Sequence, residues 1–294
     1  MAEIEIFSPA KINLTLAITG RREDGFHNLA SLVVPLAFGD DVRIKTRPER
    51  SGIVLATSNE NLPVDAGNIA WRAADLFLKT FGIRSSVDIE IRKRIPIGAG
   101  LGGGSSNGSA VLRGLSQLFE IDDSEAISNI AAKLGSDCPL FLQAEPLIMR
   151  GRGDAIERLD PDIIRSLAGM PLALFKPSFG ISTAWAYREL AASPHLYASA
   201  SQTESELEQW KQGKRSLDSL LMNSFSSVVG QKYPSIPLIL ESIQAETGSA
   251  CLMSGSGSSC FALCKGSEMA RIRSIVSEKW GKSAFFGATR ILDI

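Results

Sequence analysis

Cysteine is scarce in this sequence. The 294 residues contain four, Cys138, Cys251, Cys260 and Cys264, and none of them shows the paired C-x-x-C spacing of a zinc site. Cys260 and Cys264 lie four residues apart in an apolar run, where a strand would place both on one face as buried free thiols. We therefore expect no metal held by protein side chains, and a reducing compartment.

Long hydrophobic runs are also missing. No stretch of 18 apolar residues occurs, and the chain enters an alternating pattern between Glu3 and Phe7 instead of a basic segment followed by an apolar one. We expect no membrane span, no export signal and a cytoplasmic location.

An excess of charge of either sign is absent as well. The chain has 31 Lys and Arg against 32 Asp and Glu, a net charge of −1, which leaves no electrostatic footprint for nucleic acid or for an anionic membrane. Its 44% apolar and 21% charged residues are typical of a globular protein, and its length is sufficient for two domains. We expect a small-molecule substrate, and a monomer or a weak homodimer.

Strand and helix patterns alternate along the chain. Apolar residues at period two predict strands at 3–8, 12–18, 32–36, 41–45, 87–91, 172–175, 251–264 and 284–292. Apolar residues at helical spacing predict helices at 68–81, 105–119, 124–134, 183–192, 204–229, 235–247 and 267–280. Asn68 and Gly82 are suited to cap the first helix. Because both halves mix the two types, we expect an α+β protein with domains at 1–150 and 151–294.

The most informative stretch is Pro96–Asn107. It holds five glycines and connects a strand to a helix, so main-chain N–H groups and the helix N-terminus would point positive partial charge at one place. We interpret it as a phosphate site, at which the hydroxyls of Ser105 and Ser106 could reach phosphate oxygens or a Mg²⁺ ion. A tight turn with one of these serines as N-cap is the alternative.

Two other phosphate motifs fit the loop poorly. The spacing of Gly98, Gly100 and Gly103 satisfies the dinucleotide fingerprint, but Glu120, the acidic residue about 20 positions on, follows a helix instead of a strand. A Walker loop requires a lysine, and the glycine loop contains none.

Two further signals accompany the loop. Lys11 lies in an apolar strand pattern, where its ammonium needs an anionic partner, and Asp137 lies among small and apolar residues. An Asp–Lys pair beside phosphates could deprotonate a hydroxyl, although each residue alone could also be structural. A second glycine and serine run, Met253–Ser259, precedes a strand and is also compatible with a flexible hairpin.

These segments, in this order, resemble the GHMP kinase family (galacto-, homoserine, mevalonate and phosphomevalonate kinases). The similarity narrows to members that act on a cytidine diphosphate conjugate of methylerythritol in the non-mevalonate route to isoprenoids. It is carried by Ala10–Leu14, Gly20–His27, Leu101–Asn107 and Gly135–Pro139. The resemblance implies a two-domain fold with its active site in the inter-domain cleft, ATP as co-substrate with Mg²⁺, and phosphorylation of the 2-hydroxyl.

The resemblance also assigns roles to residues. Lys11 and Asp137 would be the catalytic pair, with Asp137 as the base. The ATP phosphates would be held by Pro96, Ile97, Gly98, Ala99, Gly100, Leu101, Gly102, Gly103, Gly104, Ser105 and Ser106, with Asn68 and Lys93 near the adenosine. Substrate-side positions are Asn13, Phe26, His27, Thr183 and Tyr187. His27 would hydrogen-bond the cytosine edge, and the rings at positions 26 and 187 would sandwich the base.

The sequence departs from the family pattern at Phe26, usually tyrosine, at Asn28, usually glutamate, and at Asn223–Ser226, where an Asn-Asp-Leu-Glu-like segment is usual. A homoserine or mevalonate kinase is the nearest alternative. A catalytically silent nucleotide-binding regulator is an alternative of another class, and the presence of both Lys11 and Asp137 disfavours it.

Overall fold

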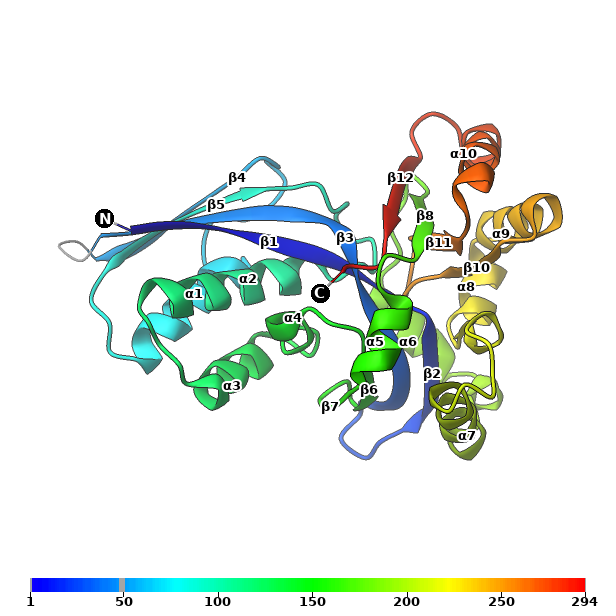
Figure 1. Cartoon of the computed structure of the whole chain (residues 1–294), viewed down its shortest axis with the longest axis horizontal. Helices are drawn as coiled ribbons and strands as arrows, with labels where there is room; N and C mark the ends of the chain where they lie inside the picture. The colour runs from blue at the N-terminus through cyan, green and yellow to red at the C-terminus, as the bar shows by residue number, and fades with distance from the viewer. Residues whose placement is uncertain (1, 48–50, 294) are drawn as a thin grey trace. The chain divides into compact units, whose positions relative to one another are not determined.

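The computed structural model describes residues 2–47 and 51–293, which divide into two compact units (Figure 1). Unit 1 contains Met1–Ala10, Phe38–Pro96 and Gly102–Glu145, and unit 2 contains Lys11–Ala37, Ile97–Leu101 and Pro146–Ile294. The long strands β1 (Ala2–Asn13) and β3 (His27–Arg47) contribute residues to both units. The domain boundary expected after residue 150 stays a prediction.

Unit 1 packs helices against one side of a group of strands (Figure 1). The second half of β3 pairs antiparallel with β5 (Ser86–Arg92), and β5 pairs parallel with β4 (Gly52–Thr57). The helices are α1 (Ile69–Thr80), α2 (Gly103–Leu118), α3 (Ser124–Leu134) and α4 (Leu140–Gln143). Alternate β5 residues, Val87, Ile89 and Ile91, are buried in one cluster with Phe77 and Leu115. Their period of two is the reason this segment is a half-buried strand.

Unit 2 contains two groups of strands. In the first, β2 (Thr15–Arg21) pairs with the first half of β3 and with β9 (Met222–Asn223), while β6 (Leu147–Gly151) pairs with β3 and with β7 (Ala155–Arg158). The second is an antiparallel sheet in the order β10 (Ala250–Met253), β11 (Cys260–Leu263), β8 (Pro171–Lys176), β12 (Phe285–Arg290).

Helices of unit 2 bury an apolar cluster with these strands. They are α5 (Pro161–Leu167), α6 (Thr183–Ala191), α7 (Ala200–Lys211), α8 (Ser226–Lys232), α9 (Ser235–Thr247) and α10 (Gly266–Trp280), with 3₁₀ turns η1 (Pro194–Leu196) and η2 (Asp218–Leu220). Phe175 of β8, Ile239 of α9 and Ile275 of α10 are fully or almost fully buried in this cluster.

Several predicted elements are confirmed. The helices at 124–134 and 235–247 have the predicted bounds, and Asn68 caps α1, whose C-cap is Phe81 instead of Gly82. The strands expected at 32–36 and 41–45 are parts of the single strand β3. Position 39 of this strand requires glycine, because a Cβ there would lie 2.3 Å from the Ser8 carbonyl oxygen.

Three predictions about the elements are wrong. The break expected between the strands at 3–8 and 12–18 is absent, because β1 runs from Ala2 to Asn13 and β2 begins at Thr15. The helix expected at 204–229 is interrupted, because α7 ends at Lys211 and the positive φ of Gly213 leaves the helical region before η2, β9 and α8. The strand expected at 251–264 is two antiparallel strands, since Gly255 and Gly257 also take positive φ and the chain reverses. The elements β4, β6, β7, α4 and α5 had no predicted counterpart.

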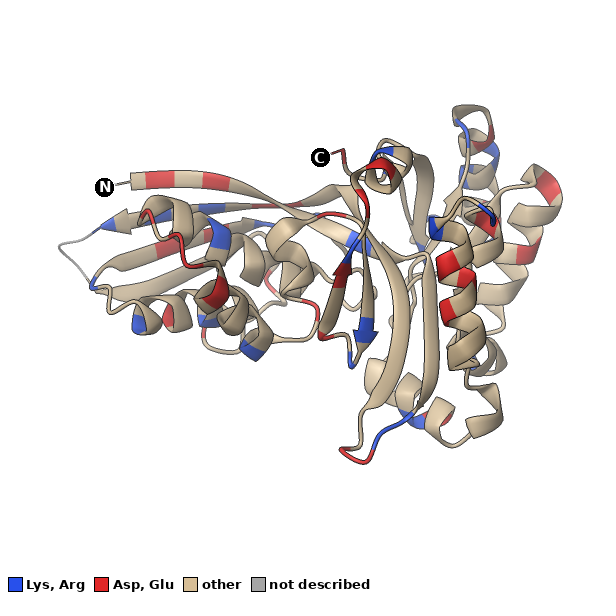
Figure 2. Ribbon diagram, turned by 60° about the horizontal axis from the view of Figure 1, so that its bottom comes forward, with Lys and Arg blue, Asp and Glu red and all other residues tan. Residues whose placement is uncertain are grey.

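Acidic and basic segments are interspersed along both units (Figure 2). Within residues 2–47 and 51–293, no helix has the length and apolar character needed to cross a membrane. All four cysteines are free thiols, and Cys260 and Cys264 are buried as expected.

Candidate active site

The first glycine loop begins in unit 2, where Ile97–Leu101 folds with two glycines at positive φ, Gly98 at +62° and Gly100 at +75°. A Cβ at Gly100 would lie 2.9 Å from the Ser254 carbonyl oxygen and 3.0 Å from that of Gly257. These atoms are main chain and cannot rotate away. Only glycine therefore allows the two glycine-rich runs to approach so closely.

The second glycine run is a packed element of unit 2. Its serines at 254, 256, 258 and 259 are between 0% and 6% exposed. Its Ser259 N–H donates to the Ala99 carbonyl at 3.2 Å, which ties it to the first loop. The run does connect two antiparallel strands as a hairpin, but it is buried, whereas flexible loops run over the surface with their polar groups in water.

Two of the predicted substrate-side positions also contact the second glycine run. The Asn13 N–H donates to Ser254 Oγ at 3.2 Å, and the hydroxyls of Thr183 and Ser256 are hydrogen-bonded at 2.8 Å. The run therefore joins the first loop, strand β1 and the start of α6 within unit 2.

Lys11 lies on β1 and is 7% exposed. Its N–H donates to the Leu101 carbonyl at 3.0 Å, and its Nζ donates to Asn13 Oδ1 at 2.7 Å. Asn13 Nδ2 in turn donates to Ser31 Oγ at 2.8 Å. The side chain is held in a buried polar chain beside the end of the first loop.

The remainder of the first loop belongs to unit 1. Gly102, with φ of +70°, is the N-cap of α2, which begins at Gly103. The alternative in which Ser105 or Ser106 caps this helix is wrong. Ser105 is half-buried, and the Ser106 hydroxyl accepts a hydrogen bond from Ser8 Oγ at 2.8 Å. Free N–H groups at the first turn of α2 remain available to an anion.

A buried charge network supports this turn inside unit 1. Asp40, with a fully buried carboxylate, accepts from the N–H groups of Arg94 and Ile95 at 2.7 and 2.9 Å and pairs with Lys93 Nζ. Asn107 Nδ2, in the first turns of α2, donates to the same carboxylate at 2.9 Å. The network joins the end of β5 to the start of α2.

The two positions predicted near the adenosine have local partners. Asn68 Oδ1 accepts from the Ala70 N–H at 3.0 Å and its Nδ2 donates to the Pro63 carbonyl at 2.9 Å, so it caps α1. Lys93 is bound to Asp40. A role toward adenosine stays a prediction for both residues.

Asp137 lies in unit 1, half-buried in the connection between α3 and α4. The next residue, Cys138, donates its N–H to the Gly135 carbonyl and accepts at its own carbonyl from Ser109 Oγ at 2.7 Å, which fixes the turn. Burial raises the pKa of the Cys138 thiol to about 11, so this sulfur stays protonated and is no nucleophile. The predicted pairing of Asp137 with Lys11 stays a prediction.

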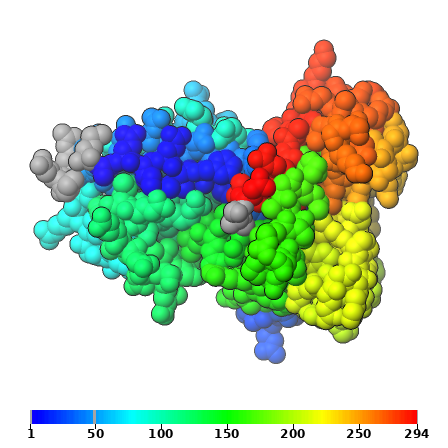
Figure 3. Space-filling model, in the orientation of Figure 1, coloured from blue at the N-terminus to red at the C-terminus, as the bar shows by residue number. Residues whose placement is uncertain are grey.

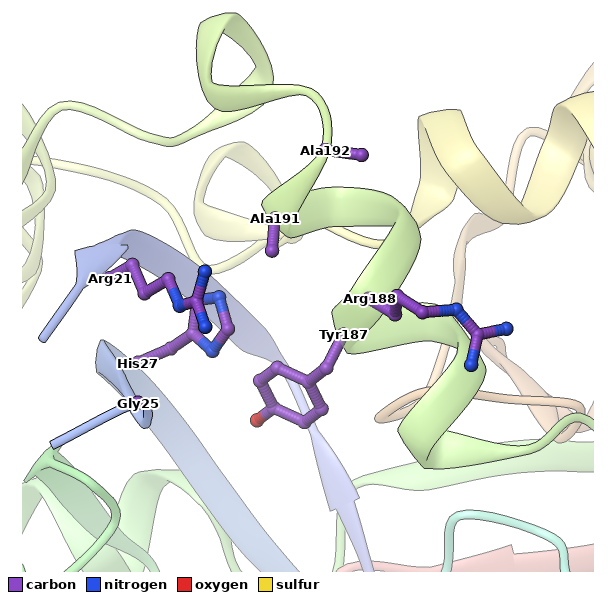
Figure 4. A pocket seen from close by; sticks show the side chains of 7 residues that line it. All are labelled: Arg21, Gly25, His27, Tyr187, Arg188, Ala191 and Ala192. Carbon is purple, nitrogen blue, oxygen red and sulfur yellow. The ribbon is translucent and has the colours of Figure 1, made fainter.

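A pocket of about 440 Å³ lies in unit 2 between the β2–β3 turn and helix α6 (Figure 4). His27 and Tyr187 face it with their ring centroids 5.1 Å apart, whereas Arg188 points away from the histidine. His27 is 8% exposed, and its Nε2 has no hydrogen-bond partner among the described residues. Burial, and secondarily the charge of Arg21, lowers the pKa of His27, which keeps the imidazole neutral near pH 7.

Phe26 lies on the β2–β3 turn, which stands out from the surface of unit 2 at the lower edge of Figure 3. The ring is 55% exposed, and the Arg152 guanidinium lies 5.1 Å from its centroid. Phe26 is thus an apolar face available to a ligand, held on one side by a cation–π contact.

Sequence reasoning missed several residues of these contacts. Tyr197, whose ring centroid is 6.0 Å from that of His27, comes from a polar segment that carries no recognisable motif. Arg152 comes from a glycine-rich turn. Asn223 lies in a segment noted only for its departure from the family pattern, yet its amide binds the second glycine run.

Known proteins are similar to this chain over most of its length. The model of the GHMP kinases N terminal domain matches residues 68–144, and that of the GHMP kinases C terminal matches residues 205–282. A 4-diphosphocytidyl-2-C-methyl-D-erythritol kinase of Methylacidiphilum infernorum (isolate V4) is 38% identical over 270 residues, 88% of this chain and 86% of that protein.

A relative with the same name from Geobacter sp. (strain M21) is 33% identical over 283 residues, 95% of this chain and 96% of that protein. The crystal structure of a 4-(cytidine 5'-diphospho)-2C-methyl-D-erythritol kinase superposes with a TM-score of 0.77 at 31% identity. It covers 98% of this chain and 99% of the other. The similarity therefore extends over nearly the whole length of each chain.

Proposed function

This chain belongs to the GHMP kinase family, alongside the 4-diphosphocytidyl-2-C-methyl-D-erythritol kinases, and on that premise we propose that it transfers the γ-phosphoryl group of ATP to the 2-hydroxyl of 4-diphosphocytidyl-2-C-methyl-D-erythritol. The products are the 2-phosphate and ADP, in non-mevalonate isoprenoid precursor biosynthesis. The expected α+β GHMP kinase fold is confirmed by the two family models and the similar solved structure.

The donor side of the proposal is supported by the first glycine loop. Its residues 97–101 have two glycines at positive φ, and it continues into the first turn of α2, whose N–H groups have no partner within the helix. Such a loop holds a polyphosphate by main-chain donors and a helix N-terminus. We assign Pro96–Ser106 to the ATP phosphates, and Asn68 and Lys93 to the neighbourhood of the adenosine.

The acceptor side is supported by one observation above the others, the buried and unpartnered Nε2 of His27 in an aromatic pocket. An unsatisfied buried polar atom costs about 1–3 kcal/mol, which a ligand hydrogen bond offsets. Neutral imidazole offers one donor and one acceptor, a pattern suited to the edge of cytosine. We assign Asn13, Phe26, His27, Thr183 and Tyr187 to the acceptor.

Lys11 and Asp137 are the proposed catalytic pair. Asp137 takes the proton of the attacking hydroxyl, and the ammonium of Lys11 stabilises charge on the transferring group. Phosphoryl transfer depends mostly on positioning and electrostatics, so the chain Lys11–Asn13–Ser31 is relevant because it fixes the ammonium.

Mg²⁺ is part of the proposal. No group of three or more His, Cys, Asp or Glu among the described residues could hold a metal ion. In the proposal the ion arrives on the ATP phosphates and takes few protein ligands, a manner of binding that Mg²⁺ commonly shows. It would neutralise phosphate charge in the transferring group. Ser105, half-buried in the first turn of α2, is the residue we assign to its neighbourhood.

We predict that Asp137→Asn lowers turnover by at least about 10²-fold, the scale of general-base loss, while ATP affinity stays within a few-fold. The assay couples ADP release to the cytidyl substrate, and calorimetry measures nucleotide binding. The exposed Asp122→Asn is the matched control, with wild-type turnover expected. Unchanged turnover of Asp137→Asn rejects its role as the base.

Acceptor assays separate the alternatives. Phosphorylation of homoserine or mevalonate, but not of the cytidyl substrate, would assign the chain another GHMP activity. ATP binding with no transfer to any acceptor would favour a silent regulator. The proposal further includes a cytoplasmic location and a monomer or weak homodimer, which sedimentation of the purified chain at several concentrations tests.

A further inference from the structure

Few internal hydrogen bonds fix the backbone conformation of the buried second glycine run, Met253–Ser259. It makes two hydrogen bonds within itself, Ser254 N–H to the Ser259 carbonyl at 2.8 Å and Gly257 N–H to the Ser254 carbonyl at 3.0 Å. Glycine gives the backbone more freedom than any other residue, so a run with two glycines needs external contacts to stay in one conformation.

Asn223 supplies contacts of this kind. It ends the short strand β9, which pairs with β2, and its side chain is 7% exposed. Its Nδ2 donates to the carbonyl of Met253 at 2.7 Å and to that of Gly255 at 2.8 Å. These two carbonyls flank Ser254, the residue whose own carbonyl lies against Gly100.

The orientation of the Asn223 amide is fixed on both ends. Its Oδ1 accepts from the Phe225 N–H at 2.9 Å, so a flipped amide would place an oxygen against two carbonyls and an NH₂ against an N–H. No other common side chain of this length offers two donors and an acceptor in this geometry. Aspartate has the same shape, but it replaces the donors by an oxygen.

We propose that Asn223 is a positioning residue for nucleotide binding. It holds Met253–Gly255 in the conformation that packs against Gly100, and through this contact it sets the path of Ala99–Gly100 in the first glycine loop. It does not touch the nucleotide. The inference rests on the proposed phosphate-binding role of that loop, and it gives a function to a segment that departs from the family pattern.

The test measures binding of a non-hydrolysable ATP analogue with Mg²⁺ by calorimetry, together with thermal unfolding of the full chain. We expect Asn223→Asp to raise the Kd for the analogue at least about tenfold, because a displacement of loop atoms by a fraction of an ångström weakens every main-chain contact to the phosphates. In steady-state assays the KM for ATP rises similarly.

Ser224→Ala is the matched control. This neighbour is also buried and accepts one hydrogen bond, from the Ile18 N–H at 2.9 Å, but it does not contact the glycine run. It reports the effect of losing a buried hydrogen bond in the same segment. We expect a lower melting temperature and an unchanged Kd for the analogue.

The outcomes are distinct. A Kd for Asn223→Asp equal to that of wild type, or a fall in kcat with both KM values unchanged, overturns the positioning role and leaves the proposed function intact. If wild type itself binds no analogue, the proposed function fails, and this inference with it. If Asn223→Asp does not fold, Asn223→Ala takes its place, because it removes the two donors without placing a carboxylate next to the two carbonyls. The same tenfold increase in the Kd for the analogue is then expected.

Discussion

Two buried lysines, one from each unit, are held in different ways. In unit 1, the Lys93 ammonium pairs with the fully buried carboxylate of Asp40 and donates to Asn107 Oδ1 at 3.1 Å. In unit 2, Lys176 ends strand β8 and donates to the main-chain carbonyls of residues 177 and 179, both at 2.9 Å. Among the described residues, no carboxylate lies within ion-pair distance of Lys176.

The two lysines stabilise different main-chain segments. The Lys93–Asp40 pair neutralises its own charge, and its carboxylate also orients main-chain N–H groups just before the first glycine loop. Lys176 has no acidic partner among residues 2–47 and 51–293 and donates to main-chain carbonyls of the turn after β8. The Phe179 carbonyl also accepts a hydrogen bond from Ser258 Oγ of the second glycine run at 2.6 Å. A charge pair therefore supports one loop, and carbonyl dipoles around a lone ammonium support the other.

The largest effect is expected when the charge pair is broken. Lys93→Met leaves the Asp40 carboxylate buried with three hydrogen bonds but no counter-ion, which should lower the free energy of unfolding by about 3 kcal/mol, the low end for a severed buried pair. Urea unfolding measures the loss. Lys79→Met is the control, because its ion pair with Asp75 is exposed and should be worth about 0.5 kcal/mol or less.

A second variant tests the cause. If the cost comes from the unpaired carboxylate, then adding Asp40→Asn to Lys93→Met should recover part of the stability, since the neutral amide oxygen still accepts from Arg94 and Ile95. A double variant that is less stable than Lys93→Met alone would contradict this explanation.

A smaller effect is expected for Lys176→Met. The substitution removes two hydrogen bonds to carbonyls but also removes a desolvated charge, so the loss of unfolding free energy should be about 1 kcal/mol. The same urea series measures it against Lys93→Met. Equal losses for the two variants would remove the distinction between a paired and an unpaired buried lysine.

The main features of the fold and the irregular backbone of the first glycine loop were predictable from the sequence. Helices such as α3 and α9 combine clear apolar spacing with a cap or a terminal glycine, so their ends could be read directly. The backbone of this loop was predictable because positive φ and close main-chain approach require residues without a Cβ, and glycines are visible in a sequence.

What sequence could not predict are contacts between segments far apart in the chain. The partner of Lys93 is 53 residues away, and the amide of Asn223 binds carbonyls 30 and 32 residues away. The hairpin at 251–264 was interpreted as one strand because both arms are apolar and the turn between them is buried. Neither a hydrogen bond to a distant carbonyl nor a buried turn leaves a periodic signal.

The smallest expected effect is a pH dependence of the free energy of unfolding that Lys176 causes and an exposed lysine does not. Burial lowers the pKa of Lys176 from its usual value of 10.5. Between the lowered and the usual value the unfolded state binds more protons than the folded state, so the contribution of this lysine to stability rises with pH. It is fully present above 10.5 and is lost as the pH falls through the lowered pKa.

Urea unfolding of wild type and Lys176→Met between about pH 7.5 and 10.5 should show a difference that grows in favour of wild type, with Lys79→Met as the baseline. If the difference in unfolding free energy between wild type and Lys176→Met does not change with pH, the carbonyls of residues 177 and 179 stabilise the charged ammonium as fully as a carboxylate does.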